Sequence, residues 1–386
     1  MPEIWIPYGS VDAPLDIPSE NLATIHSIAP QVPSEKELMD KIRGLDVSKS
    51  ILIFVNDLDK AISNILKAVI NHLLSNGLSS DQIAIVSESK IRSEINKICD
   101  ELTIACKTLN PTLAELGRVD NVPINVPQEI QTYDAKLMIS KVGFDPLFGW
   151  SGGSSSFLNI ALPDLINEAF NRRPDDNPHP GEETDAHKFA SNVTDIIGGV
   201  QGISVLPSSG EVADIYVGKI NDAHQTAAKK LLDTSIISLP DPPKAIICAP
   251  GSLNGSSTMS SALKSFWNII PSLKGGSSAV LLAECLDGLG SEALSLAATN
   301  RINLKNLKSR LNYFPGLEDL LYLEWAKQKA KMAMISSIPN YYLEKGLGLK
   351  SLRGMSDALP FIFGNQGTKA KVHIVPDAEH TLLKSQ

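Results

Sequence analysis

The chain has 386 residues and a net charge of −8 at pH 7, with 43% hydrophobic and 20% charged residues. This composition supports well-packed globular domains and excludes a largely disordered chain. The acidic balance, with no long run of Lys or Arg, argues against a general nucleic-acid partner. A chain of this length exceeds one ordinary hydrophobic core, so we expect two domains.

Short apolar runs alternate with helical patterns through the first half of the chain. The run Ser50–Val55 is apolar after its first residue, which is typical of a strand buried on both faces. An amphipathic helix with apolar residues from Ile62 to Leu73 follows it and ends near Gly77. The same patterns predict a strand over 82–86, a helix over 93–102 and a strand over 137–140. The segment Arg172–Asp185 is rich in Pro, Asp and Gly and predicts a long surface loop.

A second series begins after Pro240–Pro243, a segment that interrupts regular structure. It predicts strands over 245–249 and 279–283, and helices over 257–270, 291–299 and 317–334. Alternating strands and helices indicate an α/β fold of two domains, each with a mainly parallel sheet flanked by helices. We place an N-terminal domain at residues 1–240 and a C-terminal domain at 241–370. We expect residues 371–386 to return to the first domain.

The four cysteines are scattered through apolar segments and form no zinc-binding pattern; they are Cys99, Cys106, Cys248 and Cys285. This usage is typical of buried thiols in a reducing compartment. The N-terminal residues lack a signal-peptide pattern, and no apolar run reaches the roughly 20 residues of a membrane span. We therefore expect a cytoplasmic protein with no membrane association and no metal site.

Three polar segments directly follow predicted strands, at residues 56–60, 144–156 and 250–255. Ligands of open α/β sheets bind beyond the carboxyl ends of the strands, so these segments predict a ligand cleft between the two domains. The middle segment contains the run Gly149–Ser156, with the sequence GWSGGSSS. Glycines in such a run permit positive φ and a close approach of backbone N–H groups to a ligand.

These segments, in this order, resemble the nickel-pincer lactate racemase family. Val55–Asp57 matches the V-N-D motif of the family, and Gly149–Gly153 matches its G-[FY]-S-G-G motif. Further counterparts extend from Pro7–Gly9 to Gly288–Gly290, so the likeness covers most of the chain. The resemblance implies the fold of the family and an activity on 2-hydroxy acids.

The resemblance also implies a cofactor that the residues present do not match. In the family a nicotinic-acid-derived pincer is tethered to a lysine and binds nickel with a histidine, and two further histidines act as acid and base. Here Ser155 takes the place of the lysine, while Asp145 and Ile91 take the places of the acid and base histidines. Around the metal-ligand histidine the chain has Asn171–Arg173. We expect no cofactor, and the nickel-pincer nucleotide is the alternative.

Several positions of the resemblance remain suited to a ligand. Asp57 falls on an aspartate of the family, Lys60 on its substrate-binding arginine, and Lys264 on the lysine of a Gln-x-x-Lys pair. The candidate ligand-binding residues are Asp57, Lys60, Arg92, Trp150, Ser151, Gly152, Gly153, Ser154, Ser155 and Lys264. We expect the charged members to hold an anion and the Gly149–Ser156 loop to close over it. Asp145 is the candidate general base if burial raises its pKa.

Each of these residues also has a purely structural interpretation. Asp57 is as typical of a helix cap, Trp150 of packing, and Lys264 of a surface lysine. The serines suit an exposed turn, and Asp145 suits a plain loop before proline. The one histidine–carboxylate cluster, at residues 179–187, contains His179, Glu182, Glu183, Asp185 and His187. It matches no metal template and is typical of a solvated loop.

The leading hypothesis is a divergent protein of lactate racemase type that binds a small 2-hydroxy acid or a nucleotide-like ligand in the cleft, with nickel-pincer catalysis lost. The first alternative is an active 2-hydroxy-acid racemase or epimerase, hence an isomerase, with rearranged acid and base residues. The second alternative is a non-catalytic subunit that pairs with an intact relative. A homo-oligomer is also compatible with the sequence.

Overall fold

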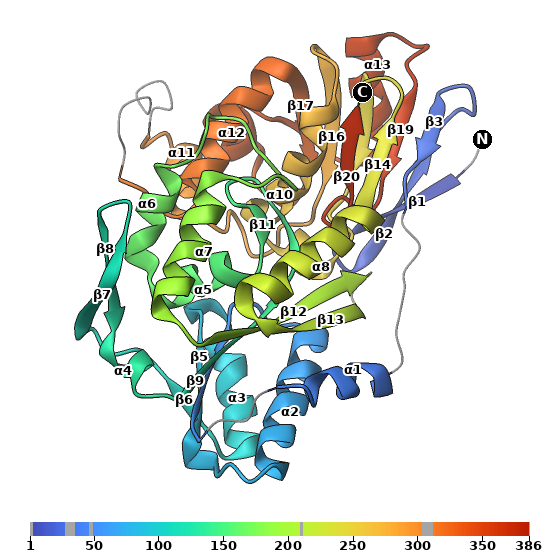
Figure 1. The fold of residues 1–386 in the computed structure, drawn as a ribbon. Helices are drawn as coiled ribbons and strands as arrows, with labels where there is room; N and C mark the ends of the chain where they lie inside the picture. Colours follow the sequence, from blue (N-terminus) through green and yellow to red (C-terminus); the bar gives the residue numbers. More distant parts are fainter. Residues whose placement is uncertain (1–2, 28–34, 46–48, 209–210, 303–311, 386) are drawn as a thin grey trace.

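Two six-stranded sheets form the framework of the molecule (Figure 1). The structure is a computed structural model that describes residues 3–27, 35–45, 49–208, 211–302 and 312–385. The first sheet has the strand order β13-β12-β9-β4-β5-β6, and the second has the order β18-β17-β16-β15-β19-β3. Neighbouring strands of both sheets run parallel, except that β12 and β13 are antiparallel.

The strands of the first sheet are β4 (Ile51–Val55), β5 (Ile83–Ser87), β6 (Ala105–Lys107), β9 (Ala135–Lys141), β12 (Val200–Ser208) and β13 (Glu211–Lys219). Those of the second are β3 (Leu22–Ile25), β15 (Ala245–Cys248), β16 (Ser277–Leu282), β17 (Ala330–Ile335), β18 (Lys350–Leu352) and β19 (Val372–Val375). Four two-stranded pairs complete the strands: β1 (Glu3–Tyr8) with β2 (Val11–Asp16), β7 (Leu113–Val119) with β8 (Val122–Pro127), β10 (Gly143–Asp145) with β11 (Gly149–Ser151), and β14 (Ile236–Leu239) with β20 (Leu382–Ser385).

The helices of the first half are α1 (Glu35–Ile42), α2 (Lys60–Ser75), α3 (Arg92–Leu102), α4 (Gln128–Gln131), α5 (Gly153–Ala161), α6 (Ile166–Phe170), α7 (Asp185–Ile197) and α8 (Ile220–Ser235). Those of the second half are α9 (Leu253–Ser257), α10 (Met259–Ile269), α11 (Glu292–Ala298), α12 (Leu317–Lys329) and α13 (Ala358–Gln366). Within the described ranges, none of these helices combines the length and the apolar character that a membrane span requires.

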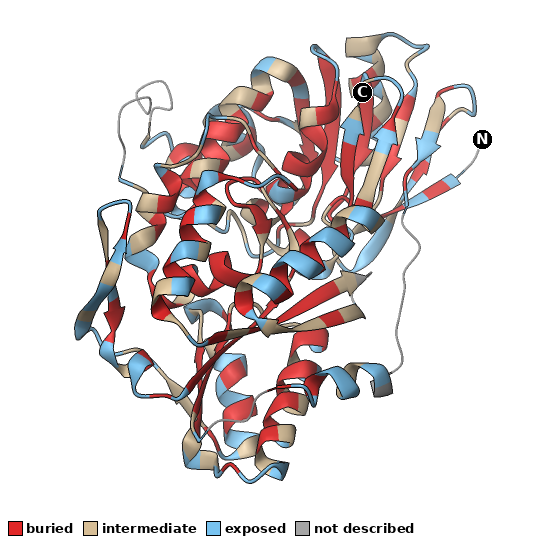
Figure 2. Cartoon of the chain, in the orientation of Figure 1, coloured by how far each residue is buried: buried red, intermediate tan, exposed pale blue. Residues whose placement is uncertain are grey.

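Apolar side chains of each strand alternate between two faces and so build the core. In β4, Ile51, Ile53 and Val55 pack with α2 and α3, whereas Leu52 and Phe54 belong to a central cluster. The central cluster also includes side chains of α5, α7, α10 and α12 and of the second sheet. Figure 2 shows the strands of both sheets as mostly buried. The two sheets therefore share the central cluster, and a separate buried cluster covers the other face of each sheet.

Segments near both ends of the chain pair with distant strands. In the C-terminal segment, β20 pairs in parallel with β14, so that Leu382 lies opposite Ile236. Leu382 also packs in a small cluster with Phe144 and Trp150. Near the N-terminus, β3 joins the second sheet beside β19. The boundaries at residues 240 and 370 stay a prediction.

The α/β class that the alternating pattern predicts, with mainly parallel sheets flanked by helices, is confirmed. The prediction of one helix over 317–334 is wrong at its end, because α12 ends at Lys329 and β17 begins at the next residue. The strand β17 lies between β16 and β18, and this pairing overrides the local helical pattern. The helix predicted over 257–270 is interrupted at Thr258, whose side chain caps α10.

The packing of the C-terminal strand gives a stability prediction. Leu382 is 3% exposed in the cluster with Trp150, so Leu382→Ala leaves a cavity and should lower the free energy of unfolding by about 2–5 kcal/mol. Urea denaturation followed by tryptophan fluorescence measures this change. The matched control is Lys384→Ala in the same strand, an exposed residue whose loss should change stability little. Equal effects of the two variants would contradict the packing.

Candidate functional site

The glycine-rich run forms the turn between a short hairpin and a buried helix. Strands β10 and β11 are antiparallel, and α5 begins at Gly153. Gly149 has φ +80, and a Cβ atom there would lie 1.7 Å from the backbone oxygen of Glu182. Gly152 has φ +92, and its Cβ atom would lie 2.4 Å from the oxygen of Lys141. These glycines permit close contact between segments of the protein's own backbone.

The serines of the run are inside the protein and have partners there. Ser154, Ser155 and Ser156 are at most 3% exposed. The hydroxyl of Ser154 lies 2.8 Å from that of Thr194, and Ser155 donates to the carbonyl of Gly152 at 2.9 Å. Ser156 accepts from the amide of Asn56 at 3.0 Å. The structure thus places these candidate ligand residues in the packing around the start of α5.

Trp150 and Ser151 precede the helix and also make internal contacts. The ring of Trp150 is 9% exposed and lies 5.6 Å from the ring of Phe144. The backbone carbonyl of Ser151 accepts a hydrogen bond from Nε2 of His224 at 3.0 Å. A Cβ atom at Gly153 would lie 2.6 Å from the His224 ring, so glycine gives this buried histidine its space.

The charged residues predicted to hold an anion contact different neighbours. Asp57 lies 3.5 Å from the ammonium of Lys141, which also pairs with Asp59, the residue that caps α2. Burial lowers the pKa of Lys141, but the carboxylates of Asp57 and Asp59 outweigh burial and raise it. Lys60 has a side chain 79% exposed and lies 3.9 Å from Glu211.

Arg92 was also predicted to hold the anion, and it lines a cavity at the edge of the first sheet. Its guanidinium donates to the hydroxyl of Thr108. None of the contacts of Lys60 or Arg92 involves Lys264. In the described residues, Lys60, Arg92 and Lys264 therefore have different contact partners, and their common role in holding an anion stays a prediction.

Asp145 and Lys264, in contrast, are brought together from the two halves of the chain. Their nearest atoms, Oδ2 of Asp145 and Nζ of Lys264, are 3.7 Å apart. The other carboxylate oxygen of Asp145 accepts from the backbone N–H groups of Leu147 and Phe148, at 2.9 and 2.8 Å. Lys264 lies on α10, and its side chain is 49% exposed. We call the group formed by Asp145, Lys264, Glu318 and Asp319 the Lys264 site.

Two carboxyl groups at the start of α12 complete this site. Asp319 is 3% exposed and accepts from Nε1 of Trp267 and from the hydroxyl of Ser260, both at 2.9 Å. One oxygen of Glu318 lies 3.4 Å from the hydroxyl of Tyr313, and the other is buried without a partner. Burial raises the pKa of Glu318, and the neighbouring charge of Asp319 raises it further. Burial also raises the pKa of Asp319, although its two hydrogen bonds lower this pKa in part.

The charge of Lys264 depends on these neighbours. Burial lowers its pKa, but the surrounding carboxyl groups outweigh burial and raise the pKa above its ordinary value. These groups belong to Asp145, Asp319, Glu318 and Glu88. Among the described residues, none accepts a hydrogen bond from the ammonium within the usual distance. Lys264 is therefore a cation with free N–H donors and an accessible surface.

Two histidines form a pair near the start of α5, and of these only His187 belongs to the cluster named in the sequence analysis. The rings of His187 and His224 are 5.5 Å apart, and Nδ1 of His187 is buried without a partner. Burial lowers the pKa of both rings, and for His224 the value is about 4. Of the cluster at residues 179–187, His179 bonds to Glu182 and to Asp175, which lies outside the cluster, whereas His187 packs against His224. In the described part of the chain, no group of three His, Cys, Asp or Glu side chains is arranged to hold a metal ion.

Comparison with known proteins identifies the fold. No protein-family model and no curated protein sequence matches the chain. Among solved structures, the lactate racemase apoprotein from Thermoanaerobacterium thermosaccharolyticum is similar with a TM-score of 0.83 at 15% identity, over 99% of this chain and 100% of that one. The chain has the lactate racemase fold. A protein of known crystal structure from Thermotoga maritima is similar with a TM-score of 0.66 at 14% identity, over 94% and 100% of the two chains.

The fold that the resemblance implies is therefore confirmed, and the chemistry of the site has to be argued from its own residues. At the place of the tethering lysine, Ser155 is 2% exposed and bonded to its own turn. At the places of the acid and base histidines stand Asp145, which pairs with Lys264, and Ile91, which is a core residue. Ser155, Asp145 and Ile91 thus offer neither an amine nor an imidazole at the positions that the resemblance assigns.

The Lys264 site makes stability depend on pH. The pKa of Glu318 is raised above its ordinary value of 4.5, so the folded state binds a proton more tightly than the unfolded state. The stability that Glu318 contributes should therefore be fully present below about pH 4.5 and be lost as pH rises toward about 8, by about 1.4 kcal/mol for each pH unit in this range. Urea denaturation across this range should show a smaller fall for Glu318→Gln. Asp176→Asn, a change at an exposed loop residue, should keep the wild-type profile; identical profiles for all three proteins would refute the assignment.

Proposed function

We propose that the Lys264 site binds a small 2-hydroxy acid. The observation that carries this proposal is the free ammonium of Lys264, which is 49% exposed although it lies among carboxyl groups. An ammonium without a hydrogen-bonded acceptor is suited to the carboxylate of a ligand. The ligand lies, in this proposal, in a cleft between the segment after β9 and the helices of the second half.

Asp145 supplies the complementary group for the 2-hydroxyl. Backbone N–H groups occupy its Oδ1 atom, whereas Oδ2 faces Lys264 at 3.7 Å. This separation exceeds a direct hydrogen bond, so Oδ2 has capacity to accept from a hydroxyl group. A 2-hydroxy acid places its hydroxyl next to its carboxylate, which matches an acceptor next to an ammonium.

The charge balance of the site supports an anionic ligand only in one protonation state. If every carboxyl group of the site were ionised, the carboxylates would outnumber the single ammonium, and the site as a whole would repel an anion. Burial raises the pKa of Glu318 to about 8 and that of Asp319 to about 6, so at neutral pH Glu318 is largely protonated, whereas Asp319, whose oxygens accept from Trp267 and Ser260, is largely ionised. With Glu318 protonated, one negative charge fewer opposes an anion beside Lys264, which can then act as the anion-binding group.

Binding of lactate to single-residue variants tests this proposal. Isothermal titration of the purified protein with D- and L-lactate should show binding that Lys264→Gln weakens at least about tenfold, because the charge-assisted hydrogen bond is lost. The matched control is Lys60→Gln, which removes an exposed lysine that the resemblance placed in the site. Propionate lacks the hydroxyl group and lactamide lacks the charge, so both should bind more weakly than lactate. Equal loss in the two lysine variants, or no binding of lactate, would refute the proposal.

We also propose that the protein carries no tethered nickel-pincer. After co-expression with the enzymes that make the nickel-pincer nucleotide, native mass spectrometry should give the mass of the unmodified chain, and metal analysis should give no stoichiometric nickel. The buried hydroxyl of Ser155 offers no amine for the tether. An intact lactate racemase from the same cells is the positive control. A chain with the added mass and nickel would show that the pocket functions without the lysine.

A second candidate function is a 2-hydroxy-acid racemase or epimerase with rearranged acid and base residues. The observation that favours it is that Asp145 and Glu318 have different surroundings. Asp145 lies beside the ammonium of Lys264, whereas burial raises the pKa of Glu318. Two carboxyl groups in such different surroundings suit the roles of base and acid. The wild-type protein should convert a pure lactate enantiomer into a mixture of both, and Asp145→Asn should abolish this conversion. Such a result would establish the activity, whereas an enantiomer that stays pure would support a binding function only.

A further inference from the structure

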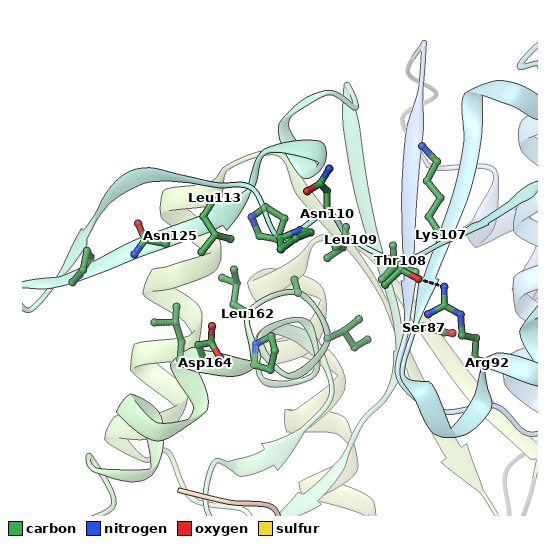
Figure 3. Close-up of a pocket in the computed structure, with 18 residues that line it drawn as sticks. Ser87, Arg92, Lys107, Thr108, Leu109, Asn110, Leu113, Asn125, Leu162 and Asp164 are labelled. Carbon is green, nitrogen blue, oxygen red and sulfur yellow. Dashed lines mark hydrogen bonds between the residues drawn. The ribbon is translucent and has the colours of Figure 1, made fainter. Parts of the chain in front are cut away.

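A cavity at the edge of the first sheet forms a second candidate binding site, which shares no residue with the Lys264 site (Figure 3). Its volume is about 360 Å³, within the range of small-molecule sites. The wall is formed by the ends of β5 and β6, the β7–β8 hairpin and the segment that follows α5. Its lining includes Ser87, Arg92, Lys107, Thr108, Leu109, Asn110, Leu113, Asn125, Leu162 and Asp164.

One end of the cavity carries an unbalanced positive charge. Arg92, Thr108 and Ser87 lie together at this end in Figure 3. Arg92 donates to the Thr108 hydroxyl, and within the described residues no carboxylate pairs with it. The hydroxyl of Ser87 is buried without a partner. A planar guanidinium with free N–H groups beside a free hydroxyl is suited to a carboxylate.

The other charged groups of the lining are balanced or distant from Arg92. Lys107 forms a salt bridge with Glu129 at 3.0 Å, and its ammonium lies 5.3 Å from the centre of the Tyr133 ring. Asp164 lies at the far end of the cavity in Figure 3. A second negative charge on the ligand would be repelled there, so the charge pattern favours a monoanion.

The middle of the cavity is apolar. Leu109, Leu113 and Leu162 line it together with several prolines. Leu113 is 47% exposed although it is a large hydrophobic residue, so a ligand that covers it gains hydrophobic stabilisation. From these observations we propose that this cavity binds a monocarboxylate with an apolar body, its carboxylate held by Arg92 and its body packed on the leucines.

A pair of probes that differ only in charge tests the proposal. Binding of 3-phenylpropanoate and of its amide, 3-phenylpropanamide, is measured by isothermal titration or ligand-observed NMR. The acid should bind the wild-type protein at least about tenfold more tightly than the amide, and Arg92→Gln should remove this difference. Arg353→Gln, a change at a side chain that is 90% exposed, is the matched control and should leave both affinities unchanged.

Two further variants keep the result interpretable. If Arg92→Gln destabilises the fold, two other variants still test the proposal. Ser87→Ala should weaken binding of the acid because it removes a hydroxyl group at the polar end, and Leu113→Asn because it removes apolar contact with the body of the ligand. Lys264→Gln should leave binding of 3-phenylpropanoate unchanged, so failure here is distinguishable from failure of the proposed lactate site. Equal binding of acid and amide, no binding of the acid, or a loss caused by Lys264→Gln would overturn the proposal.

Discussion

The pairing of Asp145 with Lys264 joins the two halves of the chain. Asp145 belongs to a short hairpin after the first sheet's β9, and Lys264 belongs to a helix of the second half. The Lys264 ammonium lies partly inside the protein. A cation that is partly removed from water is stable only if anionic or polar groups lie around it. The carboxyl groups that surround it repel one another, and burial relieves part of this repulsion because it raises the pKa of Glu318 to about 8 and so keeps a proton on Glu318 at neutral pH.

The shared core holds this electrostatic arrangement in place. Side chains from both sheets enter one cluster, and Trp267 and Tyr322 pack edge to face within it, with ring centres 5.7 Å apart. The polar atoms of these rings fix the site, because Trp267 donates to Asp319 and Tyr322 donates to the carbonyl of Pro146 beside Asp145. The apolar packing and the charged site therefore support each other.

The local sequence predicted the helices and strands but not the roles of the residues at the site. The apolar run of β4 could only be a doubly buried strand, whereas the overlong prediction of α12 failed because sheet pairing decides where β17 begins. The glycine run was found at the right place, yet a glycine signal does not distinguish approach to a ligand from approach to the backbone of Glu182. Glu318 was missed because only the folded chain places it beside Lys264, and its protonation depends on burial. With 15% identity to a lactate racemase structure, the chain shares the fold, and the chemistry of its site has to be argued from its own residues.

The titration of the Glu318 carboxyl group is the most direct test of this account. Selective ¹³C labelling of glutamate, with Glu318→Gln to assign the signal, gives its midpoint by NMR. The account predicts a midpoint well above the ordinary value of 4.5, and a still higher one in Lys264→Gln, because the neighbouring cation lowers this pKa. A midpoint at or below the ordinary value would mean that Glu318 is ionised at neutral pH. The site would then be too acidic for a 2-hydroxy carboxylate, and the central claim would be wrong.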